Sequence, residues 1–155
     1  MTVYAIVEAG PQHVAEMAVN MRHADREEAY AQTGAHPAFG VGASYGSATI
    51  AWAGLVDGQV ACVFGVSPAD EIDGKVGHPW MIGSPLVEKH QKRFLRECRE
   101  YVDAMLGLYP VLENYVDVRN TTAIRWLRWL GFDILEARPY GPYKMMFYLF
   151  RKERV

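Results

Sequence analysis

The chain has 155 residues, of which half are apolar and 22% are charged, with a formal net charge of -2. This composition is typical of a globular protein, and the length predicts one domain over residues 1–155. The charge gives no evidence for a nucleic-acid partner bound through bulk positive charge. The two cysteines, Cys62 and Cys98, lack metal-ligand spacing and predict neither a disulfide scaffold nor a metal site. We find neither a signal-peptide pattern nor an apolar stretch of bilayer length, so we expect a soluble, cytoplasmic protein with no membrane partner.

The first third of the chain predicts one strand followed by helices. Tyr4 to Val7 reads as a short strand, and Pro11 suits the first turn of a helix whose apolar residues keep helical spacing. Asp25 to Glu28 are expected to cap and open a second helix, which ends at Gly34. Residues 35–47 are rich in Gly, Ala and Ser, a composition that fits either a loop or a weak, mobile helix.

The middle of the chain predicts a β-hairpin and a third strand. Residues 48–56 and 59–66 flank Asp57-Gly58, a dipeptide that tolerates positive φ and therefore favours a two-residue hairpin turn. Residues 76–82 form the next strand. Pro79 has no N–H to donate, so it requires a bulge or an edge-like site within that strand.

The last part of the chain alternates strands and helices. Ser84-Pro85 begins a long helix that Gly107 stops, and residues 112–118 form a strand. A helix from Asn120 to Gly131 follows, and the chain closes with strands at 132–137 and 144–150. The resulting order is β-α-α-β-β-β-α-β-α-β-β, which predicts an α+β protein.

The segment from Asn120 to Phe132 carries a family resemblance. Asn120 is a preferred N-cap, and Gly131 suits the left-handed position that ends a helix. One helical face is apolar and consists of Ala123, Trp126, Leu127 and Leu130. A strand, Asn-x-x-Ala, a helix and then Gly-Phe resembles the C-terminal half of the GNAT (GCN5-related N-acetyltransferase) superfamily, whose members bind acyl-CoA. The resemblance implies a mixed, mostly antiparallel central sheet with helices on both faces.

Other segments resemble a narrower group within that superfamily. Asn114 to Asn120, Ile124 to Leu127, His23 to Glu27 and Pro79 to Gly83 are similar to the small GNAT-like proteins of tailed phages, including the internal virion protein A group. This likeness implies a protein partner from phage or host, and a location in the host cytoplasm or in the virion.

The GNAT resemblance implies acetyl-CoA as cosubstrate, bound at the start of the long helix. The residues that would bind it are Ile82, Gly83, Ser84, Lys89, Lys92, Arg93, Asn120 and Arg125. The family's glycine-rich phosphate loop is missing, because Val87, His90 and Lys92 stand where Gln or Arg, Gly, and Gly or Ala are expected. The cations have an alternative interpretation as the solvated face of an amphipathic helix.

Catalytic residues are harder to assign. The family's general acid is a tyrosine seven residues beyond the Asn, and here that position is Leu127, which cannot transfer a proton. Tyr115, Tyr140 and Tyr143 are the nearby candidates by sequence, with packing as their alternative role. A general base could come from Glu71 or Asp73 on the preceding loop, or from His78, since histidine is a common general base. His78 could equally be a strand-end residue that hydrogen-bonds backbone.

His23, Asp25 and Glu28 are the candidates for recognising a cationic amine acceptor, since the resemblance puts them on the acceptor side of the cleft. The alternative is that Asp25 to Glu28 are a cap and an exposed charged turn. Arg125 and Trp129 lie at i and i+4, where a cation could cover an indole or the pair could offer a surface for an adenine ring.

Two functions follow as hypotheses. The first is an acyl-CoA-dependent N-acyltransferase that moves an acetyl group from acetyl-CoA to an amine. The second is a non-catalytic GNAT-fold phage protein that acts in virion assembly or binds a host or phage protein, which accounts for the missing glycines and for Leu127. A protein that binds CoA without transferring the acyl group lies between them.

Overall fold

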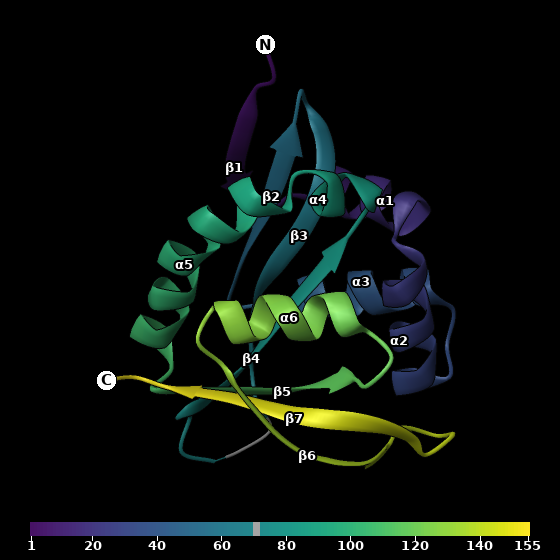
Figure 1. Cartoon of the computed structure of the whole chain (residues 1–155), viewed down its shortest axis with the longest axis vertical. Coiled ribbons are helices and arrows are strands. Elements are labelled where there is room, and N and C mark those ends of the chain that lie inside the picture. Colours follow the sequence, from purple (N-terminus) through teal and green to yellow (C-terminus); the bar gives the residue numbers. More distant parts are fainter. Residues whose placement is uncertain (70–71) are drawn as a thin grey trace.

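The computed structural model describes residues 1–69 and 72–155 and shows a central sheet with helices on both faces (Figure 1). The strands are β1 Tyr4–Glu8, β2 Ile50–Val56, β3 Gln59–Pro68, β4 Val76–Gly83, β5 Val111–Asp117, β6 Asp133–Tyr140 and β7 Met145–Glu153. The helices are α1 Pro11–Asn20, α2 His23–Thr33, α3 Pro37–Ser47, α4 Pro85–Lys89, α5 Gln91–Leu108 and α6 Thr121–Trp129. The predicted α+β class is confirmed.

The sheet is mostly antiparallel. Its strand order is β1-β2-β3-β4-β5-β7-β6, and among the described strands only the β4–β5 pair is parallel. The predicted hairpin joins β2 to β3, and both turn residues have positive φ, 49° at Asp57 and 81° at Gly58. This is the backbone conformation for which the Asp-Gly dipeptide is suited.

The parallel pair β4–β5 splits after its first two residues. Val76 pairs with Val111 and Gly77 with Leu112, and beyond this point the ladder ends. Figure 1 shows the two strands diverging. Pro79 lies on the unpaired edge of β4, which confirms the edge-like site that its missing N–H requires.

Apolar residues cover both faces of the sheet. On one face α5 and α6 bury the larger cluster, which includes Phe94, Leu112, Val116 and Trp126. On the other face α1 and α3 bury a smaller cluster around Met17, Val41 and Val63. The split between β4 and β5 therefore has an apolar layer on one side and the α1 to α3 layer on the other.

Residues 35–47 form helix α3 from Pro37 onward, which settles the choice between loop and helix. Pro37 occupies the first turn, where its missing N–H costs nothing, and the side chain of His36 accepts a hydrogen bond from the N–H of Ala38 at 3.1 Å. Val41 is fully buried against the sheet. Packing of this one side chain offsets the weak helix propensity of the glycines.

Two predicted helix boundaries are wrong. The second helix begins at His23, so Asp25 lies inside its first turn rather than capping it. The long helix predicted from Ser84 is two helices, because the chain breaks at His90, where φ is -112°. The ring of His90 hydrogen-bonds the hydroxyl of Tyr4 on β1 at 2.8 Å, a contact that sequence periodicity does not reveal.

None of the helices in the described part of the chain is both long enough and apolar enough to cross a bilayer.

Candidate functional site

A cavity of about 180 Å³ lies where β4 and β5 diverge. The side facing α5 and α6 is apolar and includes Met81, Val116, Leu127 and Phe150. The side facing α2 and α3 carries polar groups and includes Glu28, Gln32, Ser44 and Trp80. Trp80 adds an indole N–H that is buried and has no hydrogen-bond partner among the described residues.

The open end of the split is occupied by a buried arginine. Arg22 is 4% exposed, and its guanidinium donates to both carboxylate oxygens of Asp25, at 2.7 and 3.1 Å. It also donates to Glu88 of α4 at 2.6 Å and to the side-chain oxygen of Asn120 at 3.1 Å. We refer to Arg22, Asp25, Glu88 and Asn120 as the Arg22 cluster.

The Arg22 cluster ties the diverging strands together at their carboxyl ends. Gly83, the last residue of β4, accepts a hydrogen bond from the Arg22 N–H at 2.7 Å and donates its own N–H to Asp25 at 2.8 Å. Asn120, which follows β5, donates to Asp25 at 3.2 Å. Figure 1 shows α2, which carries Asp25, beside the ends of both strands. The cluster therefore closes the split at this end.

The charge on Arg22 is stabilised inside the protein. Burial opposes that charge, but the hydrogen bonds and negative charges of Asp25 and Glu88 outweigh it and raise the pKa of Arg22. The guanidinium also lies 5.0 Å from the centroid of the Trp126 ring, within cation–π distance. Each of the three guanidinium nitrogens thus donates to a group of this protein.

Glu28 lies beside the Arg22 cluster on the next turn of α2. It accepts hydrogen bonds from the N–H of Asp117 at 2.8 Å and from the side chain of Asn120 at 3.4 Å. Burial, together with the nearby negative charge of Asp25, raises the pKa of Glu28 to about 8. Glu28 is therefore a carboxyl group that exchanges its proton near neutral pH.

Three of the predicted acyl-CoA residues, Gly83, Ser84 and Asn120, make hydrogen bonds within the protein. The N–H of Gly83 and the side chain of Asn120 are engaged in the Arg22 cluster. The hydroxyl of Ser84 accepts from the N–H of Leu86 at 3.3 Å, and Pro85 at the start of α4 has no N–H. Free backbone N–H groups at a helix start are what would hold a pyrophosphate. At the start of α4 these donors are therefore absent or occupied, and Glu88 adds a negative charge beside them.

Among the other predicted cofactor residues, Ile82 lines the cavity, whereas the cations do not. Ile82 packs with the cluster under α1 and α3, on the opposite face from α5. Arg93 pairs with Glu97 at 2.8 Å and covers the ring of Tyr4. Lys89, Lys92 and Arg125 are exposed on the helices. Exposed positions fit both interpretations of these cations, as a solvated helix face and as contacts to a phosphate.

Of the predicted catalytic residues, the cavity includes one. Tyr115 lines it and stacks on Tyr140, with ring centroids 4.4 Å apart. His78 instead contacts the carbonyl oxygen of Glu113 at 2.7 Å and is absent from the lining, which matches its structural interpretation. Glu71 lies outside the described residues. Leu127 lines the cavity as an apolar side chain.

The three predicted acceptor residues do not all lie at the cavity. The side chain of His23 is 85% exposed and pairs with Glu27, so it faces solvent. Asp25 is 8% exposed, so the interpretation of Asp25 as part of an exposed turn is wrong, because Arg22 and Gly83 hold it inside. Both Asp25 and Glu28 line the cavity.

The predicted pairing of Arg125 with Trp129 is also wrong. The cation over the Trp129 ring is Arg99 of α5, at 3.9 Å from the centroid. Sequence analysis also missed Arg22, the residue that organises the site. Its partners lie 3, 66 and 98 positions away in the chain, and only the first is visible as a helical i, i+3 spacing.

The chain is similar in structure to several GNAT enzymes. An acetyltransferase of the GNAT family from Streptococcus pneumoniae matches with a TM-score of 0.67 and 17% identity over 99% of this chain and 100% of that chain. A GCN5-related N-acetyltransferase from Kribbella flavida matches with a TM-score of 0.71 and 16% identity over 97% and 98%. The aminoglycoside acetyltransferase AAC(6')-Ib in complex with coenzyme A matches at 0.68 and 13% over 98% and 95%. These likenesses show that the chain has the GNAT fold.

Sequence comparison adds a different relative. Residues 72–136 match the family described as bacteriophage T7, probable scaffold protein Gp13. No curated protein matches the chain in sequence. The matched region spans β4 to α6 and so includes both strands of the split.

Proposed function

We propose that this protein is a non-catalytic GNAT-fold phage protein that acts in virion assembly by binding another phage or host protein. The observation that carries the proposal is the Arg22 cluster. This cluster places buried, paired charges at the carboxyl end of the β4–β5 split. That end is where acyl-CoA enters GNAT enzymes.

Opening that end would be costly. If Arg22 left the cluster, Asp25 would remain buried without its cation, and breaking a buried ion pair in this way costs about 3–5 kcal/mol. A cosubstrate would have to supply that free energy before it gained any affinity. The cost favours a permanently closed split over a site that opens in each turnover.

Further support comes from the residues around the split and from the sequence match. The phosphate loop lacks its glycines, and Leu127 occupies the position of the family's acid. The matched phage family is described as a probable scaffold protein, and the match covers the elements that form the split. A scaffold needs a stable shape and a partner surface rather than a reactive centre.

The second candidate is acyl transfer to an amine, and Glu28 favours it. A carboxyl group with a pKa of about 8 beside a cavity is mostly protonated at neutral pH, and its ionised fraction could accept a proton from an ammonium group. In this alternative the Arg22 cluster would be one conformation of a gated site.

Thiol release from acetyl-CoA distinguishes the candidates. The purified chain is incubated with acetyl-CoA and a panel of small amines and lysine peptides, with the aminoglycoside acetyltransferase as a positive control. We expect no release above the uncatalysed rate. Release that Glu28→Gln abolishes, in a variant that remains folded, would establish the second candidate.

The assembly role needs a separate measurement. A tagged chain is expressed from the encoding phage, and particles and assembly intermediates are separated on a density gradient. We expect the tag in one of these fractions. A tag found solely in the soluble fraction throughout infection would contradict the assembly role.

A further inference from the structure

We propose that the surface formed by α5 and α6 binds single-stranded nucleic acid. This inference does not depend on the proposed assembly role or on the β4–β5 split. We call this surface the α5–α6 basic surface, and its cations are Lys92, Arg96, Arg99, Arg125 and Arg128.

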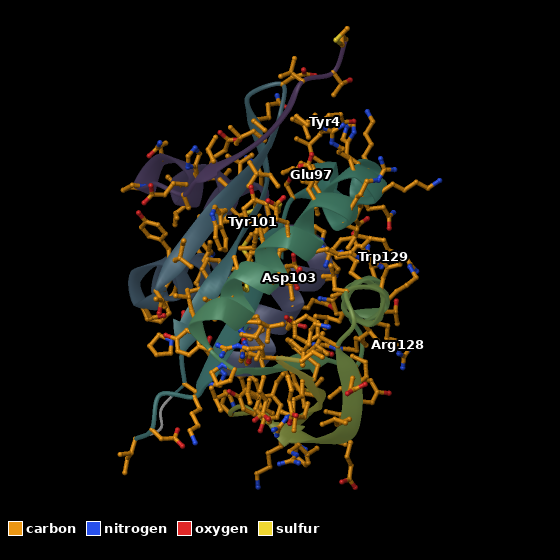
Figure 2. The ribbon with its side chains drawn as sticks, turned by 90° about the vertical axis from the view of Figure 1, so that its left-hand side faces the viewer. Tyr4, Glu97, Tyr101, Asp103, Arg128 and Trp129 are labelled. Carbon is orange, nitrogen blue, oxygen red and sulfur yellow. The ribbon has the colours of Figure 1, made fainter. Side chains whose placement is uncertain are left out.

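The cations gather because of helical spacing on two adjacent helices. Lys92, Arg96 and Arg99 lie at i, i+4 and i+7 on α5 and therefore share one face. Arg99 joins this face to α6, since its guanidinium lies 3.9 Å from the Trp129 ring and donates to the Trp129 carbonyl oxygen at 3.4 Å. Figure 2 shows Arg128 and Trp129 projecting from α6 beside α5.

The positive charges of these cations are not neutralised by ion pairs within the described part of the chain. Elsewhere arginines pair with acids, as Arg93 does with Glu97 and Arg119 with Asp117. In residues 1–69 and 72–155, by contrast, no carboxylate lies within ion-pair distance of any cation of the α5–α6 basic surface. A net charge of -2 for the whole chain conceals this local excess.

The surface continues into a hollow at the end of α6. This hollow has a volume of about 290 Å³ and is lined by Arg99, Asp103, Trp129 and Lys152 among others. Lys152 contributes one more cation there, whereas Glu100 and Asp103, four residues after Arg96 and Arg99, are the acids on this side of α5. Positive charge therefore predominates along the α5–α6 basic surface and in the hollow.

Trp129 distinguishes the expected ligand from a simple acidic peptide. Its side chain is 43% exposed although the ring is large and apolar. An exposed indole among guanidinium groups matches the way proteins bind single strands, with aromatic rings for bases and cations for phosphates. Bases in a duplex are already stacked and cannot use the ring. Guanidinium groups also hold phosphates with paired N–H donors.

Fluorescence anisotropy of a labelled oligothymidylate of about 16 nucleotides tests the proposal. The full chain is titrated between about 50 and 200 mM salt. If about four phosphates are neutralised, log K should fall against log salt with a slope of about -3. Arg96→Ala combined with Arg125→Ala should reduce that slope to about -1.4. Arg138→Ala on the edge strand β6 is the matched control and should leave it unchanged.

Trp129→Ala tests the stacking contribution. It should weaken binding about 5- to 100-fold without changing the salt slope, because it removes a ring and no charge. The thermal midpoint of each variant is measured as a control. Because the substituted residues lie on the surface, we expect these midpoints to equal that of the wild-type chain.

Several outcomes would overturn the proposal. They are no binding at about 50 mM salt, equal affinity for a duplex with no effect of Trp129→Ala, and tighter binding of polyglutamate than of the oligonucleotide. Displacement of the oligonucleotide by micromolar acetyl-CoA would also overturn the proposal, because the α5–α6 basic surface would then be part of a cofactor site.

Discussion

Replacing Arg22 by Met removes the guanidinium that organises the closed end of the split while keeping a flexible apolar chain of similar length. The Arg22 side chain is 3% exposed and donates hydrogen bonds to Asp25, Glu88 and Asn120. The substitution therefore tests whether the Arg22 cluster is a structural element or a loosely held gate.

The expected cost follows from what each partner loses. Glu88 has a side chain that is 48% exposed, so water can replace the arginine there at small cost. Asp25 is different, because it is buried and would keep just two neutral donors, the N–H of Gly83 and the side chain of Asn120. Removing one partner of a buried pair costs 3–5 kcal/mol, and the remaining donors favour the lower end, about 3 kcal/mol.

Urea denaturation measures this cost. With a slope of about 2 kcal/mol per molar urea, the midpoint should fall by about 1.5 M. Arg93→Met is the control, because Arg93 forms an exposed i, i+4 pair whose loss should cost less than about 1 kcal/mol. Combining Arg22→Met with Asp25→Asn should recover part of the loss, since the stranded charge is removed. A midpoint within about 0.3 M of wild type would refute a closing role for the cluster.

Two further substitutions probe the neighbouring residues. Asn120→Ala should lower the free energy of unfolding by about 2 kcal/mol in urea titrations. The substitution removes the α6 cap at the Ala123 N–H and the contacts to Arg22 and Asp25. An unchanged midpoint would mean that this cap contributes nothing. The pKa of Glu28 is about 8 in the folded chain against 4.5 when unperturbed, so the folded state retains a proton that the unfolded state releases. The free energy of unfolding should therefore fall as pH rises from about 5 to about 8, and a Glu28→Gln variant with the same pH dependence as wild type would show that Glu28 is not the group responsible.

The order of elements could be predicted from the sequence because its signals are local. Asp57-Gly58 fixes a turn by its own backbone preference, and Gly131 ends α6 with a φ of 92°. The side chain of Asn120 accepts from the Ala123 N–H, as a cap should. Each of these signals depends on a few neighbouring residues, so no tertiary information is needed.

The site could be predicted much less well, because its contacts are long-range. Arg22 was overlooked since Glu88 and Asn120 approach it from distant elements. Asp25 has the sequence context of a solvated helix start, and the N–H of Gly83 makes it a buried residue instead. His90, at the break between α4 and α5, likewise contacts a distant residue, Tyr4 on β1.

Thermal unfolding with and without acetyl-CoA tests the closed split most directly. A ligand at about 100 times its Kd adds about 2.7 kcal/mol, which would raise the Tm of a chain of this size by about 5–11 °C. We predict no change in Tm at about 1 mM acetyl-CoA, a hundredfold excess over a Kd of about 10 µM, while the aminoglycoside acetyltransferase in parallel is stabilised. A saturable increase in Tm of the wild-type chain would contradict the account, because it would require an acyl-CoA site that the Arg22 cluster leaves open.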